Sequence, residues 1–196
     1  PIRYVAVSNF GCTETIDERD ILLILNKTYN PKSTAYFEDF SDGASGWSSG
    51  TLVDTVNTWT MGKATGRVFN APEGTMAWYT KIPDKQHSKE EHSYVVSPCF
   101  NFENSARPMI KMKIWKAFYT SDNLDGAVLE YWTPKSNWTT LGKVDDALNW
   151  YNNSSEIEGE PGIGKIGWTH YGSSSADKDW VIAKHTLDDL AGEAKV

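Results

Sequence analysis

The chain has 196 residues and a formal net charge of −7 at pH 7, with 39% hydrophobic and 13% aromatic residues. This apolar and aromatic content excludes a disordered segment, and the length is sufficient for one large β domain. The acidic balance without a basic stripe argues against a nucleic-acid partner, and no apolar run is long enough to insert into a membrane.

The first 33 residues are predicted to form an N-terminal pair of extra strands followed by a linker. Two short apolar runs, at residues 4–8 and 21–25, are separated by a polar stretch, which is typical of a hairpin. Residues 26–34 contain a proline and carry no periodic pattern, so we expect a linker there. The second predicted domain covers residues 34–196.

In this second domain, short β-prone runs recur at regular intervals between clusters of Gly, Asn, Asp, Ser and Pro. This spacing predicts an all-β fold, either a sandwich or a barrel. The predicted strands are residues 35–40, 59–62, 76–80, 93–97, 109–118, 127–132, 139–143 and 180–185. A turn or two of helix is predicted only at residues 187–194, where apolar residues fall at helical spacing.

Side chains alternate most clearly in residues 109–118. The inward set is Ile110, Met112 and Ile114, and the outward set is Lys111, Lys113 and Trp115. In the next strand, Leu129 and Tyr131 form the apolar set, which places Glu130 and Trp132 on the opposite face. Both tryptophans are therefore expected on an outer face, on neighbouring strands.

A series of short motifs carries a resemblance to a known family. In chain order they are Phe37-Glu38-Asp39, Gly46-Trp47, Ala77-Trp78, Ser97-Pro98-Cys99-Phe100-Asn101-Phe102, residues 125–131, residues 138–142, Asn149-Trp150-Tyr151-Asn152, Gly167-Trp168 and Trp180. The series resembles MAM-like and reelin-like (concanavalin A-like) jelly-roll modules of secreted or cell-surface multidomain proteins of Bacteroidetes, including type IX secretion substrates. Residues 4–25 resemble the end of an Ig-like repeat.

The resemblance covers about residues 36–196 and implies a jelly-roll β-sandwich at the cell surface or in the secreted fraction. Members of this family continue past the position of Val196 into two more strands, so the module is expected to lack its last strands. An open sheet edge would result, and a strand-donating partner chain could fill it. Cys12 and Cys99 are compatible with one disulfide or with two separate thiols.

The resemblance also implies a structural calcium ion. Hard cations take six to eight oxygen ligands, largely from carboxylates and backbone carbonyls. The candidate ligands are Glu38, Asp39, Asp42 and Asp125. The alternative is that these acids are ordinary turn residues.

An aromatic platform is the candidate ligand-binding site. Sugars stack on exposed indole rings, and a few polar groups fix their orientation. The candidate residues are Trp115, Trp132, Lys113 and Glu130. The alternative is that a loop or the N-terminal strands cover these rings.

The acids of residues 156–160 suggest a different function, because Glu156 and Glu160 resemble the alternating acids of laminarinase-type glycoside hydrolases. Retaining hydrolases hold their two carboxyl groups about 5–5.5 Å apart, whereas positions i and i+4 of a strand lie about 13 Å apart. The four histidines show no metal-binding spacing, and no catalytic triad motif is present. Together with the two outward tryptophans, the family resemblance implies a non-catalytic extracellular binding or adhesion module that contacts glycans or proteins at a bacterial cell surface. The alternatives are a glycoside hydrolase and a structural spacer of a large adhesin.

Overall fold

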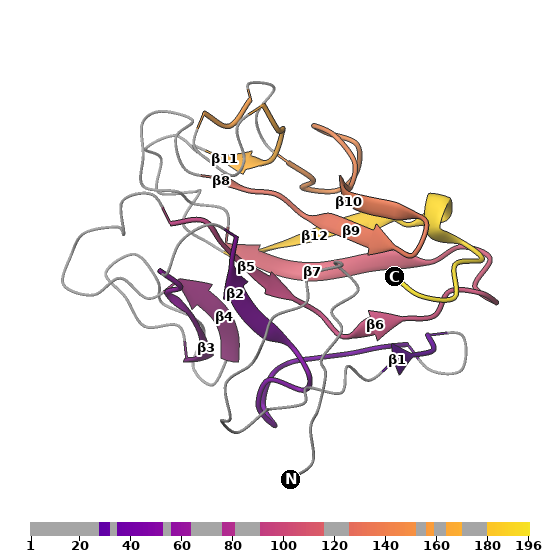
Figure 1. Cartoon of the computed structure of the whole chain (residues 1–196), viewed down its shortest axis with the longest axis horizontal. Helices are drawn as coiled ribbons and strands as arrows, with labels where there is room; N and C mark the ends of the chain where they lie inside the picture. Colours follow the sequence, from indigo (N-terminus) through magenta and orange to yellow (C-terminus); the bar gives the residue numbers. More distant parts are fainter. Residues whose placement is uncertain are drawn as a thin grey trace, which may run out of the picture.

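The computed structural model describes residues 28–31, 35–52, 56–63, 76–80, 91–115, 126–151, 156–158, 164–169 and 180–196 (Figure 1). Within this part of the chain the regular elements are β-strands, apart from the short 3₁₀ helix η2 (Asp188–Leu190). The all-β prediction is therefore confirmed, and the jelly-roll order of the strands stays a prediction. The predicted hairpin at residues 4–25 lies outside the described residues.

The strands are short, as expected for a chain with frequent turn residues. They are β1 (Thr28–Tyr29), β2 (Ser48–Thr51), β3 (Trp59–Lys63), β4 (Met76–Thr80), β5 (Ser93–Val96), β6 (Cys99–Phe100), β7 (Met109–Trp115), β8 (Gly126–Ala127), β9 (Glu130–Thr133), β10 (Ser136–Thr140), β11 (Trp168–Thr169) and β12 (Trp180–Thr186).

Antiparallel pairing dominates. β2 pairs with β5, β3 with β4, β7 with β12, β8 with β11 and β9 with β10, while β1 and β6 form a parallel pair. In Figure 1 the long β7–β12 pair runs across the middle, with β9 and β10 on one side and β6 and β1 on the other. Antiparallel pairs of this kind are typical of sandwiches, which bury one face of each sheet.

The strands predicted from periodicity are largely confirmed. β3, β4, β5, β7 and β12 coincide with predicted strands to within a residue or two, apart from residues 116–118, which lie outside the described part. The predicted strand 127–132 divides into β8 and β9, and β10 begins three residues before the predicted start. The alternation in β7 is also confirmed, because Ile110, Met112 and Ile114 pack against the core whereas Lys111 and Lys113 are exposed.

The prediction of a strand at residues 35–40 is wrong. The Glu38 carboxylate accepts a hydrogen bond from the backbone N–H of Phe40 at 2.6 Å, and Phe40 has a left-handed φ of 62°. A side chain that bonds the backbone two residues on stabilises a turn in place of a strand. Conversely, Thr28–Tyr29 forms β1 inside the predicted linker, because β6 supplies its hydrogen-bonding partner.

The core is a cluster of aromatic and aliphatic side chains beneath β7, β9 and β12. Its buried members are Phe102, Leu141, Trp150, Tyr151, Trp168, Ala183, Leu187 and Leu190. The rings of Trp150, Tyr151 and Trp168 contact one another at centroid distances of 4.7–5.5 Å. Tilted and edge-to-face contacts of this type add to the free energy gained from burial.

The backbone carbonyl of Leu141 accepts hydrogen bonds from two of these aromatic residues. The Leu141 oxygen accepts a hydrogen bond from Trp150 Nε1 at 2.9 Å and another from the Tyr151 hydroxyl at 2.8 Å. Burial raises the pKa of the Tyr151 hydroxyl well above its ordinary value, so this group stays protonated and remains a donor. The core therefore buries two polar aromatic residues with their donors satisfied.

The backbone of residues 99–102 is bonded on both sides. On one side, Asn101 N–H donates to the Tyr29 carbonyl at 2.8 Å. On the other side, Phe100 and Val196 exchange two backbone hydrogen bonds of 2.9 Å, and Phe102 N–H donates to the Glu193 carbonyl at 2.8 Å. The C-terminal residues 192–196 therefore occupy one edge of β6 and β1 occupies the other.

We expect the aromatic core to dominate stability. Trp150→Ala should lower the free energy of unfolding by about 3–5 kcal/mol, because it removes a fully buried ring and leaves a cavity. Tyr151→Phe should cost about 1 kcal/mol, the typical net value of one buried hydrogen bond. Urea unfolding monitored by fluorescence measures both. The control is Trp138→Ala, at a site 46% exposed, which should change the value by less than about 0.5 kcal/mol. Equal losses at positions 150 and 138 would contradict this account of the core.

Candidate functional site

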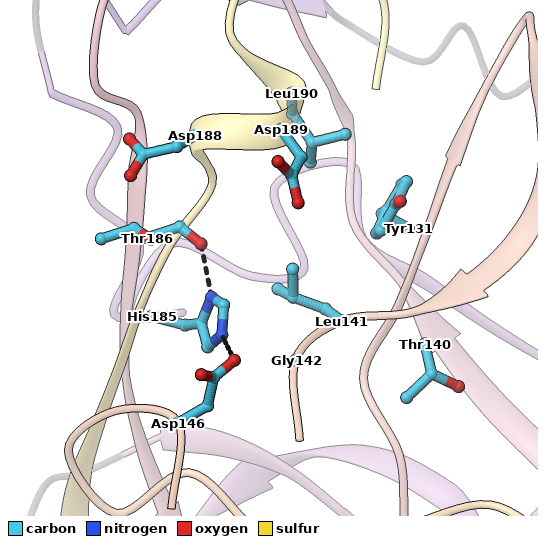
Figure 2. A pocket seen from close by; sticks show the side chains of 10 residues that line it. All are labelled: Tyr131, Thr140, Leu141, Gly142, Asp146, His185, Thr186, Asp188, Asp189 and Leu190. Atoms are coloured by element: carbon cyan, nitrogen blue, oxygen red, sulfur yellow. Dashed lines mark hydrogen bonds and ion pairs between the residues drawn. The ribbon is translucent and has the colours of Figure 1, made fainter.

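A depression of about 300 Å³ lies beside the C-terminal end of β12, between β12, the end of β10 and η2 (Figure 2). Its lining combines hydroxyl, carboxylate and imidazole groups with a few apolar side chains. The residues that line it are Tyr131, Thr140, Leu141, Gly142, Asp146, His185, Thr186, Asp188, Asp189 and Leu190.

His185 is the central polar group of this depression. Its Nε2 lies 2.9 Å from Asp146 Oδ2, and its Nδ1 is hydrogen-bonded to the Thr186 carbonyl oxygen. Figure 2 shows the ring held between these two groups. A carboxylate and a carbonyl can only accept hydrogen bonds, so each of these interactions uses an N–H of the ring as its donor. The hydrogen bond from His185 lowers the pKa of the Asp146 carboxyl below its ordinary value.

The loop of residues 143–151 positions Asp146. Three of its residues have left-handed backbone angles, Asp145 (φ 55°), Asn149 (φ 53°) and Tyr151 (φ 42°). The loop is bonded to the free edge of β12, since Lys184 N–H donates to the Leu148 carbonyl at 3.0 Å and Asn149 Nδ2 donates to the Ile182 carbonyl at 2.9 Å. Left-handed angles at non-glycine residues are unfavourable, and the surrounding contacts must hold them in place.

The depression can recognise a ligand through hydrogen bonds. Asp188 and Asp189 are exposed acceptors on η2, and the hydroxyl of Thr140 can both donate and accept. The half-buried Tyr131 also lines the depression, together with the nearly buried Leu141 and Leu190, so its apolar area is small. Convergent polar groups over a small apolar area are the usual composition of a ligand site.

The predicted calcium ligands do not form a cage in the described part of the chain. The carboxylates of Glu38 and Asp39 accept hydrogen bonds from the backbone of their own turn, at Phe40 and Ser41. No group of three or more His, Cys, Asp or Glu side chains suited to a metal occurs among the described residues, which include Asp42. Asp125 lies outside them. The structural calcium ion therefore stays a prediction.

The predicted aromatic platform is divided between different parts of the sheet structure. β7, with Lys113, pairs with β12, whereas β9, with Glu130 and Trp132, pairs with β10. Glu130 forms an ion pair with Lys165 at 2.6 Å, and Lys195 Nζ lies 5.9 Å from the centre of the Trp132 ring. The side chain of Trp115 lies outside the described residues. The aromatic platform therefore stays a prediction.

The remaining predicted sites add little. Glu156 is exposed, and Glu160, its proposed catalytic partner, lies outside the described residues, so the hydrolase alternative stays untested. Cys99 lies half-buried in β6, and Cys12 also falls outside the described part. His185 and Asp146 were missed by sequence reasoning because they are 39 residues apart and match no motif.

Comparison with known proteins identifies no relative, since no family model, no curated protein and no solved structure matches the chain. The likeness to MAM-like modules therefore stays a prediction. Among the described residues, no helix is long and apolar enough to cross a membrane.

A substitution at Gly142 measures how closely the side chains beside the depression are packed. Its φ is +74°, and a Cβ at this position would lie 2.5 Å from His185 Nε2 and 2.7 Å from Trp150 Nε1. Gly164 is a matched control, because its φ is +75° and nothing lies within 4 Å of its Cβ position. We expect Gly164→Ala to cost roughly 1–2 kcal/mol from backbone strain alone. Gly142→Ala should cost a further 1–3 kcal/mol from overpacking, measured by urea unfolding. Equal losses in the free energy of unfolding for the two variants would contradict tight packing around Gly142, because His185 and Trp150 would then have moved to accept the methyl group.

The His185–Asp146 pair predicts an acid-sensitive contribution to stability. Because folding lowers the pKa of Asp146 from 3.8, its carboxylate favours the folded state above that pH. The contribution is lost as the pH falls from about 4 through the folded-state pKa. The difference in free energy of unfolding between the native chain and Asp146→Asn should therefore be constant from about pH 5 to 4.5 and shrink toward pH 2. The exposed neighbour Asp145, changed to Asn, serves as the control. A difference that does not vary with pH would contradict the role of the pair.

Proposed function

We propose that this chain is a non-catalytic extracellular binding module that contacts glycans or proteins at a bacterial cell surface. The observation that carries the proposal is the depression beside β12, which is lined by carboxylates, hydroxyls and a few apolar side chains. Sugars present hydroxyl groups around a partly apolar ring, and this composition is complementary to them.

The size of the depression favours a small recognition element. Ligand pockets typically measure roughly 300–1,000 Å³, so a volume of about 300 Å³ suits the terminal sugar of a chain or one protein side chain. Because Asp188 and Asp189 lie on its rim, a neutral or cationic group is favoured over an anionic one.

The engagement of His185 supports binding over catalysis at this depression. A general base needs a ring nitrogen free to accept a proton from a reacting group. Both nitrogens of His185 are instead occupied, one by Asp146 and one by the Thr186 carbonyl. The residue therefore holds the wall of the depression together.

The proposal is tested with an array of neutral bacterial glycans, followed by calorimetry on the ligands that bind. The double variant Asp188→Asn, Asp189→Asn should weaken binding by about 10- to 100-fold, because the loss of even one hydrogen bond to a charged group removes roughly 1.5–3 kcal/mol of binding free energy. Thr140→Val, which removes one hydroxyl, should weaken it less.

The control is Asp42→Asn combined with Asp145→Asn, two exposed acids that do not line the depression. Unchanged affinity in the Asp188, Asp189 double variant would contradict a binding role for the depression. Release of reducing sugars from the bound glycan would contradict the non-catalytic assignment.

A further inference from the structure

The outer face of the β7–β12 pair gathers lysines from both strands. Residues directly opposite in an antiparallel pair share a face, and the register places Lys111 opposite Lys184 and Lys113 opposite Ile182. The opposite face of the same strands is the buried one, where Met112 is paired with the fully buried Ala183. Three ammonium groups therefore project from one side of the sheet.

Lys111 and Lys184 face each other at the closest kind of cross-strand position. Lys184 N–H donates to the Leu148 carbonyl, on the edge of β12 away from β7. The pair is consequently of the non-hydrogen-bonded type, in which the Cα atoms lie about 4.5 Å apart and side chains are nearest. Like charges directly opposite destabilise a sheet, so folding alone does not favour this arrangement.

No acidic side chain offsets these charges within the described residues. The ion pairs found there involve Lys135, Lys165 and His185. Lys111 and Lys113 are exposed and Lys184 is half-buried. The whole chain has a net charge of −7, yet these three lysines form a local positive group. A negatively charged partner would be complementary to this group.

The same face also offers apolar surface. Met109 is 61% exposed and Ile182 is 37% exposed. Trp180, half-buried, follows Ile182 on this face and is paired in register with Trp115. Apolar and aromatic groups beside cations suit a ligand that combines charged groups with the less polar faces of sugar rings.

We propose that the outer face of β7 and β12 binds an anionic polysaccharide, one with carboxylate or sulfate groups on its sugars. The surface adds a second contact to the proposed binding role and does not use the depression, which lies on the inward side of β12 with His185. The anionic groups would pair with Lys111, Lys113 and Lys184, and the sugar rings would lie over Ile182 and Met109.

The number of the charges favours a polysaccharide over a nucleic acid. A nucleic-acid binder needs a continuous basic stripe that neutralises many phosphates. Three lysines on a chain with a net charge of −7 do not form one, so it is the small number of cations that disfavours a nucleic acid. An acidic protein segment is the other macromolecule with suitable charges, and the experiment separates it.

The test measures binding of the whole chain to polygalacturonate and dextran sulfate at low and high salt, by biolayer interferometry. Neutral dextran, poly-glutamate and oligo-dT are the comparison probes. We expect binding to one or both anionic polysaccharides that weakens with salt, and at least tenfold weaker binding to the three comparison probes. Stronger binding to poly-glutamate or oligo-dT would overturn the polysaccharide assignment.

The triple variant Lys111→Gln, Lys113→Gln, Lys184→Gln should lower affinity at least tenfold. A charge-matched control, Lys63→Gln, Lys135→Gln, Lys143→Gln, removes three exposed lysines elsewhere and should retain most of the binding. Equal losses in the two triple variants would overturn the proposal, as would no effect of the first.

The single variant Lys184→Gln separates binding from folding. It relieves the like-charge pair, so its melting temperature should be equal to or above that of the native chain while its affinity falls several-fold. A lower melting temperature with unchanged affinity would assign Lys184 a structural role and overturn the proposal. The Asp188, Asp189 double variant should bind the anionic polysaccharides normally, so failure of either proposed site is distinguishable from failure of the other.

Discussion

The carbonyl oxygen of Leu141 is the point on which the arrangement of the core depends. Two adjacent aromatic residues, Trp150 and Tyr151, both direct their polar atoms to it. This convergence requires the chain to bend sharply before and at these residues, and Asn149 and Tyr151 accordingly adopt left-handed angles. The same loop, residues 143–151, also carries Asp146, which is hydrogen-bonded to His185. The hydrogen bonds of the core and the candidate site therefore depend on the conformation of one loop.

The fold was predictable from sequence where side-chain alternation is strong. In β7, apolar residues at every second position are separated by lysines, and burial follows this pattern. β2 has the sequence Ser-Ser-Gly-Thr, which carries no such signal, and its strand conformation depends on pairing with β5. The strand predicted at residues 35–40 failed because Glu38 bonds its own backbone, an interaction that hydrophobic periodicity does not detect.

The candidate sites were less predictable than the fold. Alternation correctly placed Lys113 on the outer face, but it carries no information about the partner strand, and the strand bonded to β7 is β12. Pairing between segments distant in sequence determines that Lys184 lies opposite Lys111. The two proposed sites use consecutive residues of β12, His185 on the inward face and Lys184 on the outward face. The inward site is lined by carboxylates and the outward site by lysines, so the two sites favour ligands of different charge.

The hydrogen bonds on both sides of β6 bear on how the chain responds to tension. Tyr29 near the start of the described part and Val196 at the end of the chain are both bonded to residues 100–101. A pulling force applied between residues 28 and 196 would load these few backbone bonds first. The β7–β12 pair lies outside this direct line, so its proposed binding face would stay folded while β1 or the C-terminal residues detach. The contacts of β6 would therefore be the first part of the described fold to separate under such a force.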